Sequence, residues 1–253
     1  MTKRPHALCR LCGQVANLCN SHVIPKWCYQ NSFNKKHQLK VAATPDLRLK
    51  PEQDGYKEYL LCENCEQRFS LLESYAKPIL TDGRAPDADR EFAYALNGVD
   101  AQKIKRFILS VVWRCSVSSS APFYHIDIGD KHEKNMANAL LLDDAIPAQI
   151  YPTLIYRLMA GPDALKDLIR SPSIERIEGH RCARVILSGY LFHVFVTSHD
   201  VPRDWEGWLL REINWVPIHR VDIGDLPWLK EEWEKLREHE QLQPVLDAER
   251  AGQ

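Results

Sequence analysis

In the middle of the chain, hydrophobic residues recur at spacings of three and four positions. The residues that follow this pattern are Ile104, Phe107, Ile108, Val111 and Val112. Their period is that of an amphipathic helix, and Asp100 or the preceding Asn97-Gly98 supplies a start signal for it. A second helix is predicted over residues 130–142, and the chain is expected to be helical from about residue 100 to this point.

After residue 150 the pattern changes to runs of β-branched and aromatic residues, which are typical of strands. These runs cover residues 150–159, 181–187 and 190–197. Ser188-Gly189 stands between the last two and predicts a hairpin turn. A further strand is predicted over 208–216, followed by a helix over 227–241 that carries Trp228 and Trp233 on one side.

The first third of the chain is organised differently and is rich in cysteine. Residues 1–80 form a predicted N-terminal module, called the head below, and a polar, turn-rich segment within 81–99 reads as a linker or surface loop. Residues 100–253, called the body, are expected to form a mixed helical and antiparallel-sheet domain. The overall fold class is therefore predicted to be α+β.

Composition narrows the class of protein. The chain has 253 residues, 45% of them hydrophobic and 26% charged, and its net charge is −1. A disordered protein is excluded, because such chains combine low hydrophobicity with high net charge. No apolar stretch is long enough for a membrane span, and no signal peptide is recognisable, so a cytoplasmic protein is expected.

The charge is distributed unevenly along the chain, with a net charge of +5 over residues 1–80 and −6 over the remainder. A basic head on an acidic body suits a module that binds a polyanion.

The cysteines carry the clearest chemical signal. Cys9 and Cys12 form one Cys-x-x-Cys pair, followed by Gly13, and Cys62 and Cys65 form a second. Each pair can present two thiolates to one metal ion, and two pairs complete a tetrahedral zinc site. The second pair opens a predicted helix, over 66–77, whose N-terminus favours thiolates. A treble-clef zinc module has this order: a turn that carries two cysteines (the zinc knuckle) comes first, and a helix that begins with the other two follows.

The cysteines have two other possible uses. A thioredoxin-like dithiol belongs after a strand in a βαβ unit, and no such unit is recognisable here. Alternatively, Cys19 and His22 could complete a zinc site with the first pair alone, at the spacing Cys-x2-Cys-x6-Cys-x2-His. That arrangement would leave the second pair to find partners in Cys28 or elsewhere.

Between the two pairs lies the segment Ser21-His22-Val23-Ile24-Pro25-Lys26, and the second pair lies in Leu-Cys-Glu-Asn-Cys-Glu-Gln-Arg-Phe. Together these elements resemble the zinc-bearing HNH, or ββα-metal, nucleases, over about residues 7–80. The resemblance implies a metal-dependent endonuclease that hydrolyses DNA. A free-standing nuclease with an unfamiliar body also fits a role in bacterial antiviral defence.

The resemblance assigns roles to several residues. His22 would be the general base that activates water, since an imidazole titrates near neutral pH. Glu66 would hold a catalytic Mg²⁺ or Mn²⁺ through carboxylate oxygen, with Glu73, two helical turns further on, as a second ligand. Lys26 and Arg68 would contact the phosphate backbone, and Lys26 would also serve the catalytic site.

The chain departs from the family pattern at two positions. The residue before the histidine is usually an acidic metal ligand, and here it is Ser21. Glu66 stands where the family keeps an asparagine or histidine. Because Ser21 leaves the cation one ligand short, a non-catalytic treble-clef module that binds nucleic acid or a protein partner is the alternative hypothesis. A third is a structural zinc domain in a larger assembly, with the body as the functional part. Separately, the body is expected to offer a surface for a homodimer.

Overall fold

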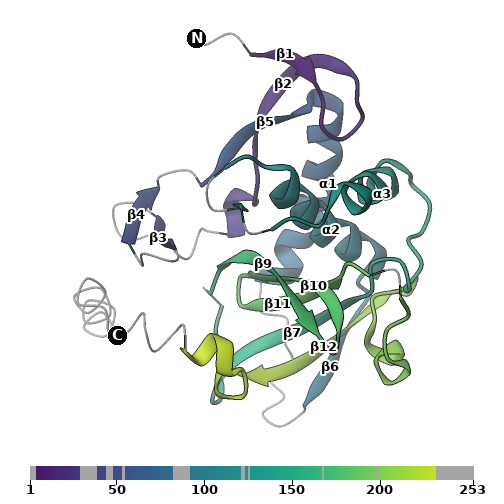
Figure 1. Cartoon of the computed structure of the whole chain (residues 1–253). Helices are drawn as coiled ribbons and strands as arrows, with labels where there is room; N and C mark the ends of the chain where they lie inside the picture. The colour runs from purple at the N-terminus through teal and green to yellow at the C-terminus, as the bar shows by residue number, and fades with distance from the viewer. Residues whose placement is uncertain are drawn as a thin grey trace.

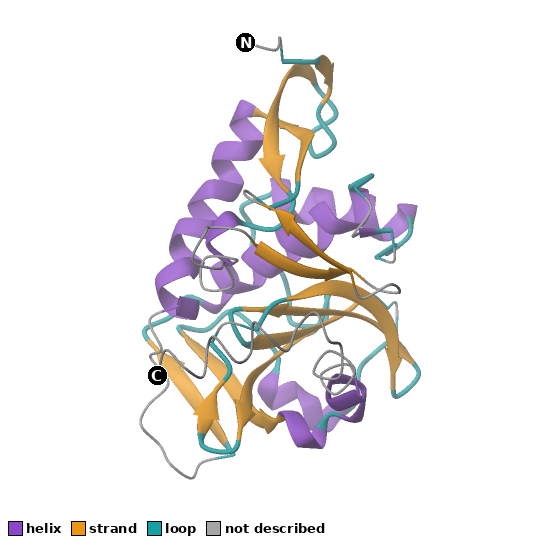
Figure 2. Cartoon of the chain, turned by 90° about the vertical axis from the view of Figure 1, so that its left-hand side faces the viewer, coloured by secondary structure: helices purple, strands orange, loops and turns teal. Residues whose placement is uncertain are grey.

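The structure is a computed structural model, which describes residues 4–28, 39–43, 48–52, 55–81, 92–120, 123–124, 126–166, 168–197 and 199–231. Figure 1 shows three levels: a small sheet at the top, helices in the middle and a large sheet below. In the view turned by 90°, the helices again lie between the two sets of strands (Figure 2). The prediction of an α+β fold is confirmed.

The head is built on a three-stranded antiparallel sheet in the order β1-β2-β5. Its strands are β1 (His6–Leu8), β2 (Val15–His22) and β5 (Lys57–Cys62). The helix α1 (Glu63–Thr81) follows β5 directly and contains the predicted helical segment 66–77. A small hairpin of β3 (Leu39–Ala43) and β4 (Arg48–Glu52) lies in the sequence between β2 and β5.

Both helices predicted for the first part of the body are confirmed. In α2 (Ala101–Val117), the carboxylate of Asp100 accepts hydrogen bonds from the N–H groups of Gln102 and Lys103, so Asp100 is the N-cap. The helix α3 is formed by Asp130–Leu141. No helix in the described part of the chain is long and apolar enough to cross a membrane.

The large sheet has seven strands. Six follow the order β6-β12-β7-β11-β10-β9, and β8 pairs with β7. The strands are β6 (Ala93–Asn97), β7 (Thr153–Ala160), β8 (Asp163–Ala164), β9 (Arg170–Ile177), β10 (His180–Leu187), β11 (Tyr190–Phe195) and β12 (Trp215–Asp222). All neighbouring pairs are antiparallel except β12 and β7, which are parallel, so the sheet is mixed and not purely antiparallel as predicted.

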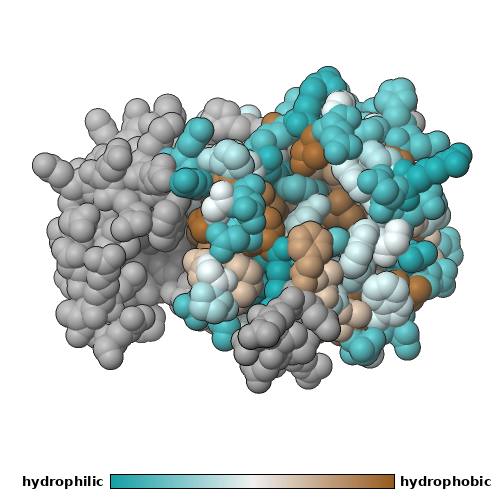
Figure 3. All heavy atoms as spheres, turned by 90° about the horizontal axis from the view of Figure 1, so that it is seen from below, coloured by the Kyte–Doolittle hydropathy of each residue, from teal (hydrophilic) through white to brown (hydrophobic). Residues whose placement is uncertain are grey.

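The central strands of this sheet are apolar on both faces. In β11, Phe192 and Val194 belong to the main core together with the buried residues of α2. Leu191 and Phe195 point to the opposite face and join two smaller apolar clusters there. On the side of the molecule seen from below, apolar residues lie grouped among hydrophilic ones (Figure 3). Burial on both faces explains why these strands read as continuous apolar runs.

The hairpin predicted at Ser188-Gly189 is confirmed, since Leu187 pairs with Tyr190 and both turn residues have positive φ. The strand predicted over 208–216 is wrong for most of its length. A 3-10 helix, η3 (Arg203–Trp208), ends where that strand was expected to begin, and β12 starts only at Trp215. The apolar residues between them, Leu209 and Leu210, are buried without forming a strand.

Two further predictions fall partly outside the described residues. Of the predicted linker, 82–91 lies outside them, whereas 93–97 forms β6 at the edge of the large sheet. Of the C-terminal helix predicted over 227–241, residues 227–231 are helical and the rest, with Trp233, lies outside them. Another 3-10 helix, η4 (Ile223–Asp225), comes just before this helix.

One hydrophobic core contains buried residues of both the head and the body, from Cys9 in the head to Ile218 in β12. Aromatic contacts cross between them: Trp27 stacks on Phe107 with ring centroids 5.6 Å apart, and Phe69 meets Trp113 edge-on at 6.2 Å. The helix α2 therefore packs against the head as well as against the large sheet.

Candidate metal centre

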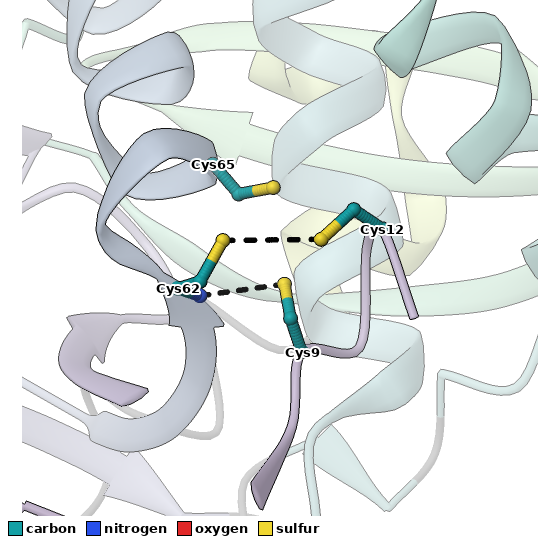
Figure 4. Close-up of side chains that lie close together, drawn as sticks. All are labelled: Cys9, Cys12, Cys62 and Cys65. Atoms are coloured by element: carbon teal, nitrogen blue, oxygen red, sulfur yellow. Dashed lines mark hydrogen bonds between the residues drawn. The ribbon is translucent and has the colours of Figure 1, made fainter. Parts of the chain in front are cut away.

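Four cysteines from two separate parts of the head meet at one point. Cys9 and Cys12 lie in the loop between β1 and β2, Cys62 ends β5, and Cys65 lies in the first turn of α1. Their four Sγ atoms all lie within 4.8 Å of one another, and those of Cys12 and Cys62 are 3.8 Å apart. The four side chains point toward a common centre (Figure 4). The predicted four-cysteine cluster is confirmed.

The cluster suits a zinc ion. Zinc–sulfur bonds of about 2.3 Å in a tetrahedron place the sulfur atoms about 3.8 Å apart, close to the separation found for Cys12 and Cys62. The loop between the first two cysteines turns tightly: the N–H of Gly13 donates to the carbonyl of Cys9 over 2.9 Å, and Gly13 has a φ of 72°. This is the left-handed backbone that glycine adopts without strain.

The surroundings of the thiols indicate why a cation is needed. Burial raises the pKa of Cys12 and of Cys65, which disfavours their thiolate forms. Burial also acts on Cys9, but N–H groups of Cys12, Cys62 and Leu11 outweigh it and lower the pKa of Cys9. One of these donors is the N–H of Cys62, 3.3 Å from the Cys9 sulfur. Four thiolates in this space require a positive ion between them.

Cys19 and His22 lie outside the metal-binding group. Among the residues that the structure describes, the group that could hold a metal consists of the four clustered cysteines alone. The alternative set with Cys19 and His22 is therefore not the one that the fold brings together. Cys28, Cys115 and Cys182 are buried in the apolar core, and burial raises the pKa of each thiol.

Next to the cluster, the end of β2 is tied to the first turn of α1. The Ser21 hydroxyl donates a hydrogen bond to Glu66 Oε2 over 2.5 Å. Ser21 is 1% exposed, whereas His22 and Glu66 are partly exposed. The structure thus brings Ser21 and Glu66 together, and His22 follows Ser21 as the last residue of β2.

Glu73 has a different partner. Its Oε1 atom forms a salt bridge of 2.8 Å with Nη1 of Arg114, a residue of α2 whose side chain is 1% exposed. The same Nη1 donates to the carbonyl oxygen of His22 over 2.8 Å. Sequence reasoning missed Arg114, although a lone arginine in the otherwise apolar run Val111–Cys115 was a usable signal, because a buried charge requires a partner.

The two predicted nucleic-acid contacts lie on the surface of the head. Arg68 Nη1 forms a salt bridge of 2.7 Å with Asp143. Hydrogen bonding to Arg68 lowers the pKa of Asp143. Lys26 is exposed, in a short 3-10 turn directly after the Ser21–Pro25 segment.

Comparison of the chain with protein family models, with curated proteins and with solved structures finds no match.

Proposed function

We propose that this protein is a metal-dependent endonuclease of the HNH, ββα-metal type, which hydrolyses phosphodiester bonds of DNA. The observation that carries the proposal is the contact between the end of β2 and the first turn of α1, which the Ser21–Glu66 hydrogen bond marks. It joins the end of β2, which carries His22, to the first turn of α1, at the edge of a four-cysteine cluster. The order of these elements supports the resemblance stated above, and the cluster would serve as the structural zinc site of a treble clef.

In this proposal His22 is the general base. Its side chain is partly exposed, so water can reach it, and an imidazole accepts a proton readily near neutral pH. Its place at the end of β2, next to the buried Ser21, gives it a defined backbone position. These features suit a residue that takes a proton from an attacking water molecule.

Glu66 is the proposed ligand for the catalytic cation. Its partly exposed carboxylate offers the oxygen donors that Mg²⁺ and Mn²⁺ prefer. When bound, such a cation would offset negative charge that develops on the phosphate. Glu73 was the second candidate, but its carboxylate pairs with Arg114, so the proposal rests on Glu66.

DNA would lie along the basic head. Residues 1–80 carry a net charge of +5, and Lys26 is exposed close to His22 in the sequence. We assign Lys26 to a phosphate contact near the reacting bond. Arg68 would contact the DNA backbone from α1, at the expense of its surface salt bridge with Asp143, which costs little to exchange.

A plasmid assay tests the proposal. Wild type, His22→Ala and His199→Ala would each be incubated with supercoiled plasmid in Mg²⁺, in Mn²⁺ and in excess EDTA. His199 is an exposed histidine of the body and serves as the matched control. We expect nicking or linearisation by wild type and His199→Ala, abolished by EDTA, and a loss of at least 100-fold in His22→Ala. Equal cleavage by His22→Ala would exclude the role of His22.

A non-catalytic zinc module that binds nucleic acid or a protein partner is the second candidate. Ser21 favours it, because this neutral hydroxyl stands where the HNH family keeps an acidic metal ligand, and it occupies an oxygen of Glu66. Binding of DNA that weakens steeply with salt, with no cleavage in any divalent metal, would support this candidate over the nuclease.

A further inference from the structure

The C-terminal half of α2 reaches the candidate site although it lies outside the head in the sequence. Arg114 extends from this helix and is 1% exposed, and its guanidinium lies 5.3 Å from the centre of the Phe69 ring on α1. Nε donates to the carbonyl of Ser110 over 3.2 Å, within α2. The side chain is thus held on its own helix while its tip enters the head.

That tip binds the peptide group directly after His22. Nη1 of Arg114 donates to the His22 carbonyl oxygen over 2.8 Å. The N–H of the same peptide group belongs to Val23 and donates to the carbonyl of Tyr56 over 2.9 Å. Both ends of one peptide plane are therefore fixed, one by α2 and the other by the chain just before β5.

The neighbouring residue pair of the head sheet is also attached to the C-terminal end of α2. Ser21 pairs with Glu58 across β2 and β5. The Glu58 carboxylate accepts hydrogen bonds from the hydroxyls of Ser118 over 2.6 Å and Ser119 over 2.7 Å, just after the end of α2. Although burial opposes it, these bonds lower the pKa of Glu58. Two independent contacts therefore attach the same end of the β2–β5 strand pair to the same end of α2.

We propose that Arg114 is a positioning residue for the active site: by fixing the peptide group after His22, it sets the imidazole relative to Glu66. The inference rests on the proposed nuclease function and extends it, since it makes the body part of the catalytic scaffold. Arg114 touches neither reacting atom nor cation in this proposal and acts only through the peptide group after His22.

The chemistry of the guanidinium explains why arginine serves here. A guanidinium is planar, permanently charged and carries five N–H donors, so it can serve a carbonyl, a carboxylate and its own helix at once. The amine of a lysine presents its three hydrogens from a single nitrogen, on a side chain of different reach. It can retain the charge next to Glu73 without restoring all of these bonds.

The test compares Arg114→Met and Arg114→Lys with Arg157→Met. Arg157 is a matched control in β7: it is 2% exposed, its Nη1 donates to the carbonyl of Ser188 over 2.9 Å, and its guanidinium lies 4.3 Å from the Tyr190 ring centre. Zinc content and circular dichroism identify the folded variants. The readouts are kcat and KM on plasmid DNA, and hydrogen exchange of peptides that cover residues 19–28.

A positioning role predicts that Arg114→Met loses at least tenfold in kcat with KM within about twofold. Arg114→Lys should recover part of that loss, and Arg157→Met should keep the wild-type kcat. Exchange over residues 19–28 should quicken in Arg114→Met, quicken less in Arg114→Lys and stay unchanged in Arg157→Met. If Arg114→Met does not fold, the same comparison of kcat and exchange is made with Arg114→Lys, for which smaller changes in the same direction are expected.

Other outcomes separate this inference from the proposed function. If wild type cleaves DNA and both Arg114 variants cleave with its kcat, the positioning role is overturned while the nuclease stands. If wild type does not cleave in any metal, the nuclease proposal fails. Hydrogen exchange then tests only whether Arg114 fixes the peptide group after His22. Unchanged exchange over residues 19–28 in the folded Arg114 variants would then overturn it as well.

Discussion

Ser21 and Glu66, which are 45 residues apart in the sequence, are joined by a hydrogen bond of 2.5 Å from the serine hydroxyl to the glutamate carboxylate. The bond spans the end of β2 and the first turn of α1, and the four-cysteine cluster ties the start of α1 to the loop that precedes β2. Negative charge at this helix N-terminus is favourable, and Glu63 and Glu66 both lie there. Ser21 is buried and its hydroxyl is neutral. The carboxylate of Glu66 can therefore still take part in a second interaction, such as binding a cation.

Replacement of Ser21 by aspartate tests that idea. Two carboxylates in this space repel each other, so without a cation Ser21→Asp should lose about 1–2 kcal/mol of unfolding free energy. Millimolar Mn²⁺ should reverse the loss, because two carboxylates hold a hard cation better than one. Thermal melting with and without Mn²⁺ measures both effects. Ser21→Asn, of similar shape but neutral, should show no such gain with Mn²⁺, and equal gains in the two variants would contradict the prediction.

Removal of a clustered cysteine should release the structural metal. Cys62→Ser is expected to lower bound zinc from about one ion per chain to a small fraction of that, and to lower the melting temperature, because zinc binding contributes directly to folding. Elemental analysis of purified protein and thermal melting provide the measurements. Cys19→Ser is the control, since Cys19 lies outside the cluster, and zinc loss in that variant would favour the set with Cys19 and His22.

Local patterns in the sequence were sufficient for the cysteine cluster and for two helices. The Cys-x-x-Cys spacing brings two thiolates together within one turn, and the cap at Asp100 and the apolar period of α2 are encoded within a few residues. The hairpin at Ser188-Gly189 is equally local. The helix, its cap and the hairpin depend on neighbours in the chain, which is why the sequence alone predicts them. The cluster joins two such local pairs, and the four ligands that one zinc ion takes relate them to each other.

Long-range choices could not be predicted in this way. Leu209 and Leu210 are apolar because they are buried in a non-strand segment, and local pattern does not distinguish this from a strand. The position of β12, antiparallel to β6 and parallel to β7, depends on partners more than 50 residues away. The salt bridge between Arg114 and Glu73 likewise joins two helices that nothing in the local sequence relates.

The turn at Gly189 should tolerate no side chain. A Cβ atom there would lie 1.8 Å from the carbonyl oxygen of Leu165, and Gly189 has a φ of 71°. Gly189→Ala should therefore cost more than about 3 kcal/mol of unfolding free energy, because main-chain atoms would have to move. Gly161→Ala is the matched control: its φ is 61°, but nothing lies within 4 Å, so a cost of about 1 kcal/mol is expected. Urea unfolding measures the loss of unfolding free energy in both variants. Equal losses would show that the main chain at Gly189 moves to accommodate the added methyl group.

Lys105 should make the stability of the protein depend on pH. Its side chain is fully buried in α2, with Nζ 2.7 Å from the carbonyl oxygen of Pro147. Burial lowers the pKa of Lys105 from 10.5 to about 7. Between these values the unfolded chain holds a proton that the folded chain has released, so the free energy of unfolding should rise with pH across this window.

Comparison of wild type with Lys105→Met isolates this effect. From pH 7 to pH 9 the free energy of unfolding of wild type should gain about 2 kcal/mol relative to Lys105→Met, since each unit of pKa difference corresponds to about 1.4 kcal/mol. The loss of a donor to Pro147 shifts the variant by a constant amount and leaves this pH-dependent difference unchanged. Urea unfolding at pH 7, 8 and 9 measures it, with the exposed Lys103→Met as control. A constant difference across this range would mean that Lys105 stays charged in the fold, held by the carbonyl groups of Ile146 and Pro147.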